Sequence, residues 1–378
     1  MRLRTATPFG FVLATLLLVA AAACTAVPSP AATTPTPTET STPELAATTT
    51  EAPLPTHTPE PTVTPVPTES GEFISPYTPS APTGSGASLD PVVLQLDLEE
   101  GALYRIRMLT TQTLSQNFEG QIFEIGQNIG FEYTYSVTSR EADGSAWVDV
   151  AYTRVLFETD TPFGTDSYDS ADPPSQIPES AEGFAAIVGS GFSMRIAPDG
   201  EVLEIEGLEQ MYDRMLSEMD FTDLETRQAF ELTFREQFNE QTMKDQISSL
   251  LFEFPEGTLQ VGDTWSSTQE TTAMLPIVVE NTYTLLDFDE NTALIEVRSE
   301  ISTGSGEGGI DLGLLDFEFT IMGTQEGMIQ VDLRTGLANS VVDQTLSGEM
   351  KIVVEGEELT VPIDILQTVQ VESVQLAP

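Results

Sequence analysis

The sequence predicts an α+β fold in which long antiparallel strands form a curved sheet or incomplete barrel, built as two related β halves with a three-helix insertion. Two observations predict it. Apolar residues alternate at period two from Leu89 onward, and residues 207–254 switch to the helical period before the alternation resumes. Turns such as Asp143-Gly144 and Asp199-Gly200 separate the alternating runs, as in antiparallel hairpins.

Residues 1–23 have the pattern of an export signal. Arg2 and Arg4 precede an apolar run, Phe9–Ala23, that is too short to span a membrane and ends in three alanines before Cys24, the only cysteine. We expect a lipoprotein signal peptidase to cut before Cys24 and a diacylglyceryl group to anchor the chain. The alternative is an ordinary signal peptidase, which would leave a free thiol. The predicted location is extracytoplasmic, with a lipid anchor in the cell membrane or envelope.

Residues 24–88 form a low-complexity segment after the predicted lipidated cysteine. Thr and Pro dominate it, as in Thr34-Pro35-Thr36-Pro37-Thr38, so it offers almost nothing to a hydrophobic core. We expect a disordered tether that reaches between about 45 Å as a coil and about 200 Å when extended. His57, the only histidine, lies here and is interpreted as a solvated linker residue.

Residues 89–378 are predicted to be the folded β-rich domain. The first β segment contains strands near 103–118, 121–138 and 145–157, then an acidic loop at 158–183, then a hairpin at 192–205. After the helical segment the predicted strands lie near 258–272, 277–286, 292–302, 314–332, 337–354 and 358–375. Tyr104 follows Gly101 by three residues and Trp265 follows Gly262 by three, which suggests that the two β segments arose by duplication.

The helical segment 207–254 is predicted to contain three helices. Thr222 and Glu225 form a capping box before the second, and Pro255 ends the third. Methionine adapts to varied shapes, so we predict that the apolar side chains of these helices line a site for an apolar ligand. The alternative is that they simply fill the core. The candidate residues are Met211, Met215, Met219, Phe230, Phe234 and Met243.

Several short motifs resemble those of an uncharacterised bacterial lipoprotein family, a domain of unknown function. They are Glu100-Gly101 with Tyr104, the strand at Gln112-Thr113, Asp199-Gly200-Glu201-Val202, and Val261-Gly262-Asp263-Thr264-Trp265. The resemblance spans most of 89–376 and implies an exported lipoprotein with a two-part β domain. It implies no activity and no catalytic residues.

Composition excludes several classes of function. The net charge of −46 opposes binding to nucleic acid. Because no His or Cys follows residue 88, catalytic Ser-His-Asp or Cys-His systems and histidine or thiolate metal sites are excluded from the domain. The glycine-rich stretch 304–309 is interpreted as a loop, and Asp287–Asn291 as a plain turn. We expect no enzyme activity, no cofactor and no metal, although calcium binding by the acidic loop 158–183 stays open.

Two functions remain. The first is a binding or carrier module that holds an apolar ligand or an envelope component between helices and sheet. The alternative is a structural or protein-interaction lipoprotein of the cell envelope with an acidic surface. The expected partners are the membrane, through the anchor at Cys24, and an apolar ligand or envelope protein.

Overall fold

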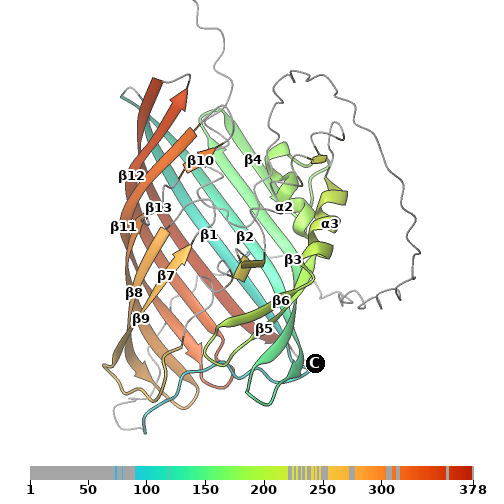
Figure 1. The fold of residues 1–378 in the computed structure, drawn as a ribbon, viewed down its shortest axis with the longest axis vertical. Coiled ribbons are helices and arrows are strands. Elements are labelled where there is room, and N and C mark those ends of the chain that lie inside the picture. Colours follow the sequence, from blue (N-terminus) through green and yellow to red (C-terminus); the bar gives the residue numbers. More distant parts are fainter. Residues whose placement is uncertain are drawn as a thin grey trace, which may run out of the picture.

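The fold is a single large antiparallel sheet, seen in a computed structural model (Figure 1). The structure describes residues 90–118, 120–219, 254–271, 277–303, 309–311, 316–354 and 357–376, with Phe73, Ile74, Pro79 and isolated positions between 224 and 247. Its strands are β1 (Leu103–Phe118), β2 (Gln121–Arg140), β3 (Ala146–Thr161), β4 (Gly164–Asp169), β5 (Gly191–Ile196), β6 (Val202–Glu206), β7 (Thr264–Thr271), β8 (Ile277–Phe288), β9 (Thr292–Thr303), β10 (Gly309–Asp311), β11 (Asp316–Asp332), β12 (Ala338–Val354) and β13 (Glu357–Leu376).

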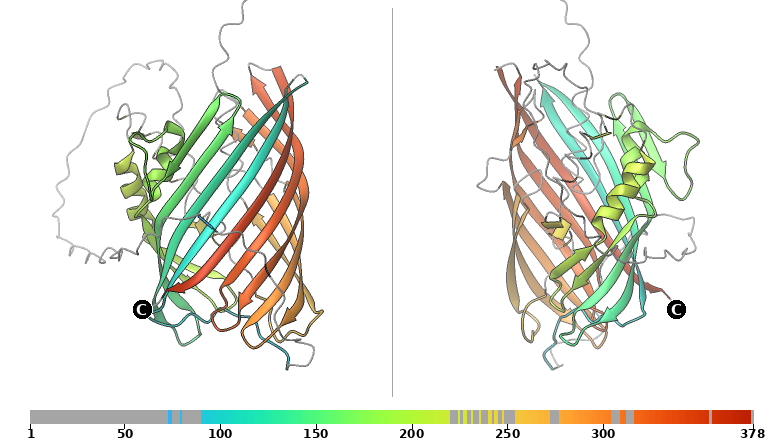
Figure 2. Two further views of the ribbon diagram at one scale, coloured as in Figure 1. Left: turned by 180° about the vertical axis from the view of Figure 1, so that it is seen from behind. Right: turned by 45° about the vertical axis from the view of Figure 1, so that its right-hand side comes forward.

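The order of the strands shows that the sheet is open. It runs β6-β5-β3-β2-β1-β13-β12-β11-β9-β8-β7, with β4 on β3 and β10 on β11, so β6 and β7 are the two ends. The first and last strands pair along most of their length, from Leu103 with Leu376 to Gln116 with Ile363. The long strands curve around a common interior (Figure 2). This pairing of β1 with β13 joins the two β segments into one sheet.

The helices differ from the sequence expectation. The described α-helices are α2 (Glu182–Ile187) and α3 (Leu208–Glu218), with a 3-10 turn, η2, at Glu179–Ala181. Both pack near β3 and β5, beside the open edge of the sheet (Figure 2). The prediction of an α+β fold with two β halves and a three-helix insertion is therefore wrong: one continuous sheet dominates, and most of residues 220–253 lie outside the described part.

The side chains alternate between two faces of the sheet. We call the face that carries Tyr104, Ile106 and Leu114 of β1 the inner face, and the face that carries Arg107 the outer face. Inner-face residues from both sides of the sheet, for example Val148 and Ile295, join one hydrophobic core with α2 and α3. Burial of these apolar side chains is the main force that holds the curved sheet together.

One end of the interior is covered by the chain before β1. Leu94, Leu96 and Leu98 are buried there, and the backbone of this segment bonds across the sheet, with Leu96 N–H donating to Pro198 and Asp97 N–H donating to Thr335. Gly336 permits this close approach, because a Cβ at that position would lie 2.2 Å from the carbonyl oxygen of Gln95. The segment thereby closes the end of the interior at which β1 starts.

The region 158–183 also differs from the expected acidic loop. β3 continues to Thr161 and β4 returns beside it, with Leu156 opposite Asp169 and Thr161 opposite Gly164. Aspartates disfavour strands, so the local sequence hid this hairpin. Among the described residues, no helix is long and apolar enough to span a membrane.

Candidate functional site

A row of polar side chains crosses the inner face at one level of the sheet. Cross-strand pairs connect it without interruption: Gln112 of β1 lies opposite Gln127 of β2 and Gln367 of β13. We call the whole row the amide belt. Its members, in the order of the strands, are Thr159, Gln127, Gln112, Gln367, Gln344, Gln325, Ser299, Asn281 and Ser267.

Part of the amide belt is hydrogen-bonded within itself. Gln344 Nε2 donates to Gln325 Oε1 at 2.6 Å, and Ser299 Oγ donates to Asn281 Oδ1 at 2.6 Å. Asn281 Nδ2 donates in turn to Ser267 Oγ at 3.4 Å. These bonds stabilise the belt on the side of β7 to β12.

The other part of the amide belt is buried without such partners. Gln112 is 2% exposed and Gln127 is 6% exposed. Among the described residues, neither Nε2 nor Oε1 of Gln112 has a hydrogen-bond partner, and neither does Oε1 of Gln127. A buried polar atom without a partner costs roughly 1–3 kcal/mol. Three such atoms on two neighbouring side chains therefore mark this part of the belt as a place where a partner from outside the chain would be stabilised.

Apolar rows flank the amide belt on both sides. Two residues further along the strands, Leu114 lies opposite Ile125 and Ile365, and all three are buried. On the other side, Ile129 of β2 lies opposite Phe157 of β3, and both are buried, while Thr110 of β1 lies between Ile129 and Val369. The unpaired amides thus sit between two mostly apolar surfaces, as the polar group of an amphipathic molecule would require.

Three tyrosines lie on the inner face between the amide belt and the end at which β1 starts. The rings of Tyr133 and Tyr135 lie 5.5 Å apart, and those of Tyr133 and Tyr152 lie 5.8 Å apart. Burial raises the pKa of Tyr152 to about 12, and it raises the pKa of Tyr133 and Tyr135 as well. The phenols therefore stay uncharged across the physiological range of pH.

The outer face opposite this region carries a row of alternating charges, which we call the charge ladder: Glu372, Arg107, Glu132, Arg154 and Asp169. Arg107 Nε donates to Glu132 Oε2 at 2.8 Å, and Arg107 Nη1 lies 3.6 Å from Glu372 Oε2. Arg154 donates to both carboxylate oxygens of Asp169, at 2.9 and 2.6 Å. Burial alone would raise the pKa of Asp169, but hydrogen bonds from Arg154 and the Ala171 N–H hold it below its usual value.

Phe73 covers the middle of this outer face. It is 5% exposed, and the Arg154 guanidinium lies 5.1 Å from its ring centroid. A Cβ on Gly130 would lie 2.7 Å from the Phe73 ring, so only glycine fits beneath it. A residue inside the predicted disordered tether therefore packs against the sheet.

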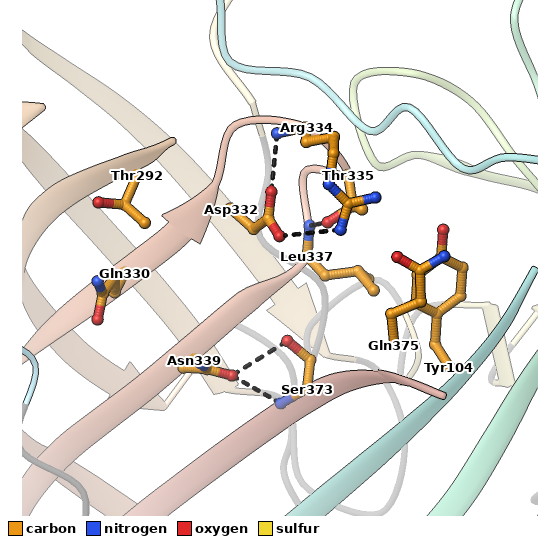
Figure 3. A pocket seen from close by; sticks show the side chains of 10 residues that line it. All are labelled: Tyr104, Thr292, Gln330, Asp332, Arg334, Thr335, Leu337, Asn339, Ser373 and Gln375. Atoms are coloured by element: carbon orange, nitrogen blue, oxygen red, sulfur yellow. Dashed lines mark hydrogen bonds and ion pairs between the residues drawn. The ribbon is translucent and has the colours of Figure 1, made fainter. Parts of the chain in front are cut away.

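A hollow lies at the end of the sheet where β12 and β13 separate (Figure 3). Its volume is about 250 Å³. Asn339 Oδ1 bridges the gap by accepting from Ser373 N–H at 2.6 Å and from Ser373 Oγ at 3.0 Å. Tyr104 lines it beside Gln375, and burial raises the pKa of the Tyr104 phenol. Within its lining, Asp332 also pairs with Arg334, and Thr335 Oγ1 accepts from the Leu337 N–H.

The structure places four of the six predicted ligand-lining residues. Met211, Met215 and Met243 belong to the hydrophobic core, and Met219 packs against it. Phe230 and Phe234 lie outside the described residues, as does Cys24. Ligand contact by these side chains stays a prediction.

The aspartates of residues 158–183, for which calcium binding stayed open, bond to their neighbours. Asp160 accepts from Thr165, Asp166 from Ser180, and Asp169 from Arg154. Within the part of the chain that the structure describes, no group of three or more His, Cys, Asp or Glu side chains could hold a metal ion.

The amide belt was missed by reasoning from sequence. A signal was present, because each of nine strands carries one polar residue at a position whose neighbours two residues away are mostly apolar. The alignment of these positions depends on the register between strands, which a single strand does not reveal.

Comparison with known proteins gives a family but no activity. No curated protein matches the chain. A structure that describes lipid–protein interactions in lipovitellin aligns with a TM-score of 0.39 at 8% identity. The alignment covers 74% of this chain and 26% of the lipovitellin chain. An outer membrane channel from Pseudomonas putida F1 has a TM-score of 0.21 at 9% identity, over 75% of this chain and 100% of that chain. For OpdQ of Pseudomonas aeruginosa the TM-score is 0.16 at 8% identity, over 73% and 99%.

These TM-scores are too low to indicate a shared fold or function, and the chain spans only 26% of the lipovitellin chain. A family model says more about where the chain belongs. The model of a domain of unknown function matches residues 143–338, which is more than half of the chain. The chain therefore belongs to the Family of unknown function (DUF6263).

Proposed function

We propose that this chain is a binding or carrier module that holds an apolar or amphipathic molecule against the inner face of its sheet. The observation that carries the proposal is the pair Gln112 and Gln127, whose buried amide atoms lack partners. A protein that only fills its core has no use for such atoms, since leucine at the same positions would avoid their cost. A bound molecule would supply the missing hydrogen bonds.

The flanking apolar rows support the same role. Leu114, Ile125 and Ile365 face the interior on one side of the amide belt, and Ile129 and Phe157 on the other. Binding sites for small molecules are mostly apolar, with a few polar groups that fix the orientation. The arrangement offers binding groups and no nucleophile–base pair, so we propose a role in binding and not in catalysis.

The proposed place of action is outside the cytoplasm. The support is the sequence of the first 24 residues, where an apolar run and three alanines precede Cys24. A diacylglyceryl anchor on Cys24 would hold the module beside a membrane, close to molecules with apolar chains. Loss of the chain from the membrane fraction in a Cys24→Ala variant would support the anchor.

The proposal is tested with the full chain purified from its own membrane. Native mass spectrometry should show an added mass that organic extraction removes. The extracted protein should then bind N-phenyl-1-naphthylamine, an uncharged apolar probe, with saturation at one site. A Gln112→Leu/Gln127→Leu variant should lose the co-purified molecule.

The matched control is Thr113→Leu, which changes an exposed residue on the outer face of the same strand. It should retain the co-purified molecule and bind the probe as the parent chain does. If the parent chain carries no added mass and shows no saturable probe binding, the carrier role is wrong. Capture of an envelope protein in its place would favour the structural or interaction role.

A further inference from the structure

The two faces of the sheet differ in charge. On the nine strands that run from β3 to β7, Arg140 of β2 is the one Asp, Glu, Lys or Arg among the inner-face residues whose side chains the structure describes; it lies opposite Ala146, at the end where β1 starts, and pairs with Asp97. The chain as a whole contains 60 acidic and 14 basic residues. The acidic residues of β2 and β13 whose side chains the structure describes, Glu124, Glu132, Asp364 and Glu372, lie on the outer face. Among the described side chains, the inner face around the amide belt is therefore free of charge.

This separation determines which polar groups the amide belt can accept. An ion that leaves water without a partner of opposite charge loses several kcal/mol of solvation free energy. Among the described residues beside the amide belt, neither a carboxylate or phosphate nor an ammonium group would meet a counter-ion, and Arg140 at the end of the interior is already paired with Asp97. The strong negative charge of the chain opposes an anion further.

The unpaired atoms specify the polar group more closely. Gln112 offers a donor at Nε2 and an acceptor at Oε1, and Gln127 offers an acceptor at Oε1. A complementary group must therefore both accept and donate hydrogen bonds while it stays uncharged. A hydroxyl beside an ester carbonyl has this character, and the apolar rows on both sides of the belt suit an attached acyl chain.

We infer that the ligand is an uncharged amphiphile with a hydroxyl and ester polar group on an acyl chain, in the class of the acylglycerols, and that Gln112 and Gln127 bind its polar group. This inference rests on the proposed carrier role and names its substrate class. Charged lipids and fatty acid anions are discriminated against because the described inner-face residues beside the amide belt provide no counter-ion.

The test uses the extracted full chain and three competitors with the same eighteen-carbon oleyl skeleton: monooleoylglycerol, oleate and oleylamine. Each competitor is titrated against bound N-phenyl-1-naphthylamine at about pH 8, where the carboxyl of oleate is ionised and the amine of oleylamine is protonated. Monooleoylglycerol should displace the probe at concentrations at least about tenfold lower than either charged competitor. Equal displacement by oleate or oleylamine would overturn the inference while leaving the carrier role in place. Binding of the probe with displacement by none of the three would also overturn it.

The variants separate the inference from a mere loss of folding. Gln112→Leu/Gln127→Leu should bind the probe but lose the preference for monooleoylglycerol, whereas Thr113→Leu should keep it. A Gln112→Glu variant places a carboxylate on the inner face and should shift the preference toward oleylamine by at least about tenfold. An unchanged preference in both belt variants would show that other residues bind the polar group. If the parent chain does not bind the probe at all, the carrier role itself fails.

Discussion

Two cross-strand pairs of β1 and β2 make an instructive comparison. Arg107 lies opposite Glu132 on the outer face, and Gln112, five residues later in β1, lies opposite Gln127, five residues earlier in β2, on the inner face. Both pairs are buried. The charged pair is fully engaged, with Glu132 accepting from Arg107 and from Thr153 Oγ at 2.9 Å, whereas the uncharged pair leaves three atoms without partners.

The difference shows where the chain meets its own hydrogen-bonding needs and where it does not. Buried ions must be paired for the fold to be stable, so the charge ladder belongs to the architecture. Unpaired amides cost less, and a protein can keep them when they serve binding. Stability and ligand binding thus depend on opposite faces of the same two strands.

The largest effect is expected on the outer face. Arg107→Met should lower the free energy of unfolding by about 3–5 kcal/mol, because it leaves Glu132 buried without its cation. Urea denaturation measures the change. Glu296→Gln is the control, since Arg298 in that pair is 69% exposed, and it should cost less than about 1 kcal/mol. A loss as small as the control's would show that the charge ladder does not stabilise the sheet.

The tyrosines of the inner face predict a loss of stability in alkali. Tyr152 ionises at about pH 12 in the folded chain and near pH 10 in the unfolded chain. The stability from its protonated form is fully present below pH 10 and is lost as the pH rises toward 12, by up to about 2.7 kcal/mol. Urea denaturation at several pH values measures this slope, which should be shallower in Tyr152→Phe. An identical slope in the variant would contradict the assignment.

Removal of the Phe73 side chain should lower the stability of the fold by a smaller amount. Phe73→Ala should lower the free energy of unfolding by about 2 kcal/mol, the value of one buried aromatic side chain, and should make the peptide bonds near residue 73 more susceptible to protease. Phe163→Ala is the matched control, because Phe163 is 79% exposed. Equal results for the two variants would mean that the tether does not pack on the sheet.

The smallest expected effect is a gain in stability, and it tests directly whether the Gln112 amide is unpaired. Gln112→Leu should raise the stability of the ligand-free chain by about 1 kcal/mol, because it removes two unpaired polar atoms. Gln344→Leu should lower it by a similar amount, because Gln344 donates to Gln325. Thermal unfolding of the extracted protein compares the two. A destabilised Gln112→Leu variant would show that this amide has a partner within the folded chain.

The antiparallel strands were predictable, and their arrangement was not. Strong alternation gave the bounds of β1 at Leu103–Phe118 as observed. The pairing of β1 with β13 joins positions as far apart as Leu103 and Leu376, 273 residues, and no local pattern reports it. The expectation of two β halves failed for that reason.

The candidate site was hidden for a related reason. Gln112, Gln127 and Gln367 each look like one polar residue in an alternating strand. They become a site only when the register aligns them, and the register follows from turns and from pairing across the whole sheet. The methionines of α3, by contrast, were predicted to line a ligand site because methionine adapts to varied shapes, yet Met211 and Met215 lie in the core.

The contact between Phe73 and the sheet has a mechanical consequence. If Cys24 carries the proposed anchor and the tether is disordered as predicted, the free part of the tether ends at Phe73, 49 residues along the chain from Cys24, and not at the start of β1. A flexible coil of that length spans roughly 40 Å. A force applied through the tether would then act on the outer face of the sheet, halfway along β2 at Gly130. It would act across the strands before it acted on their ends.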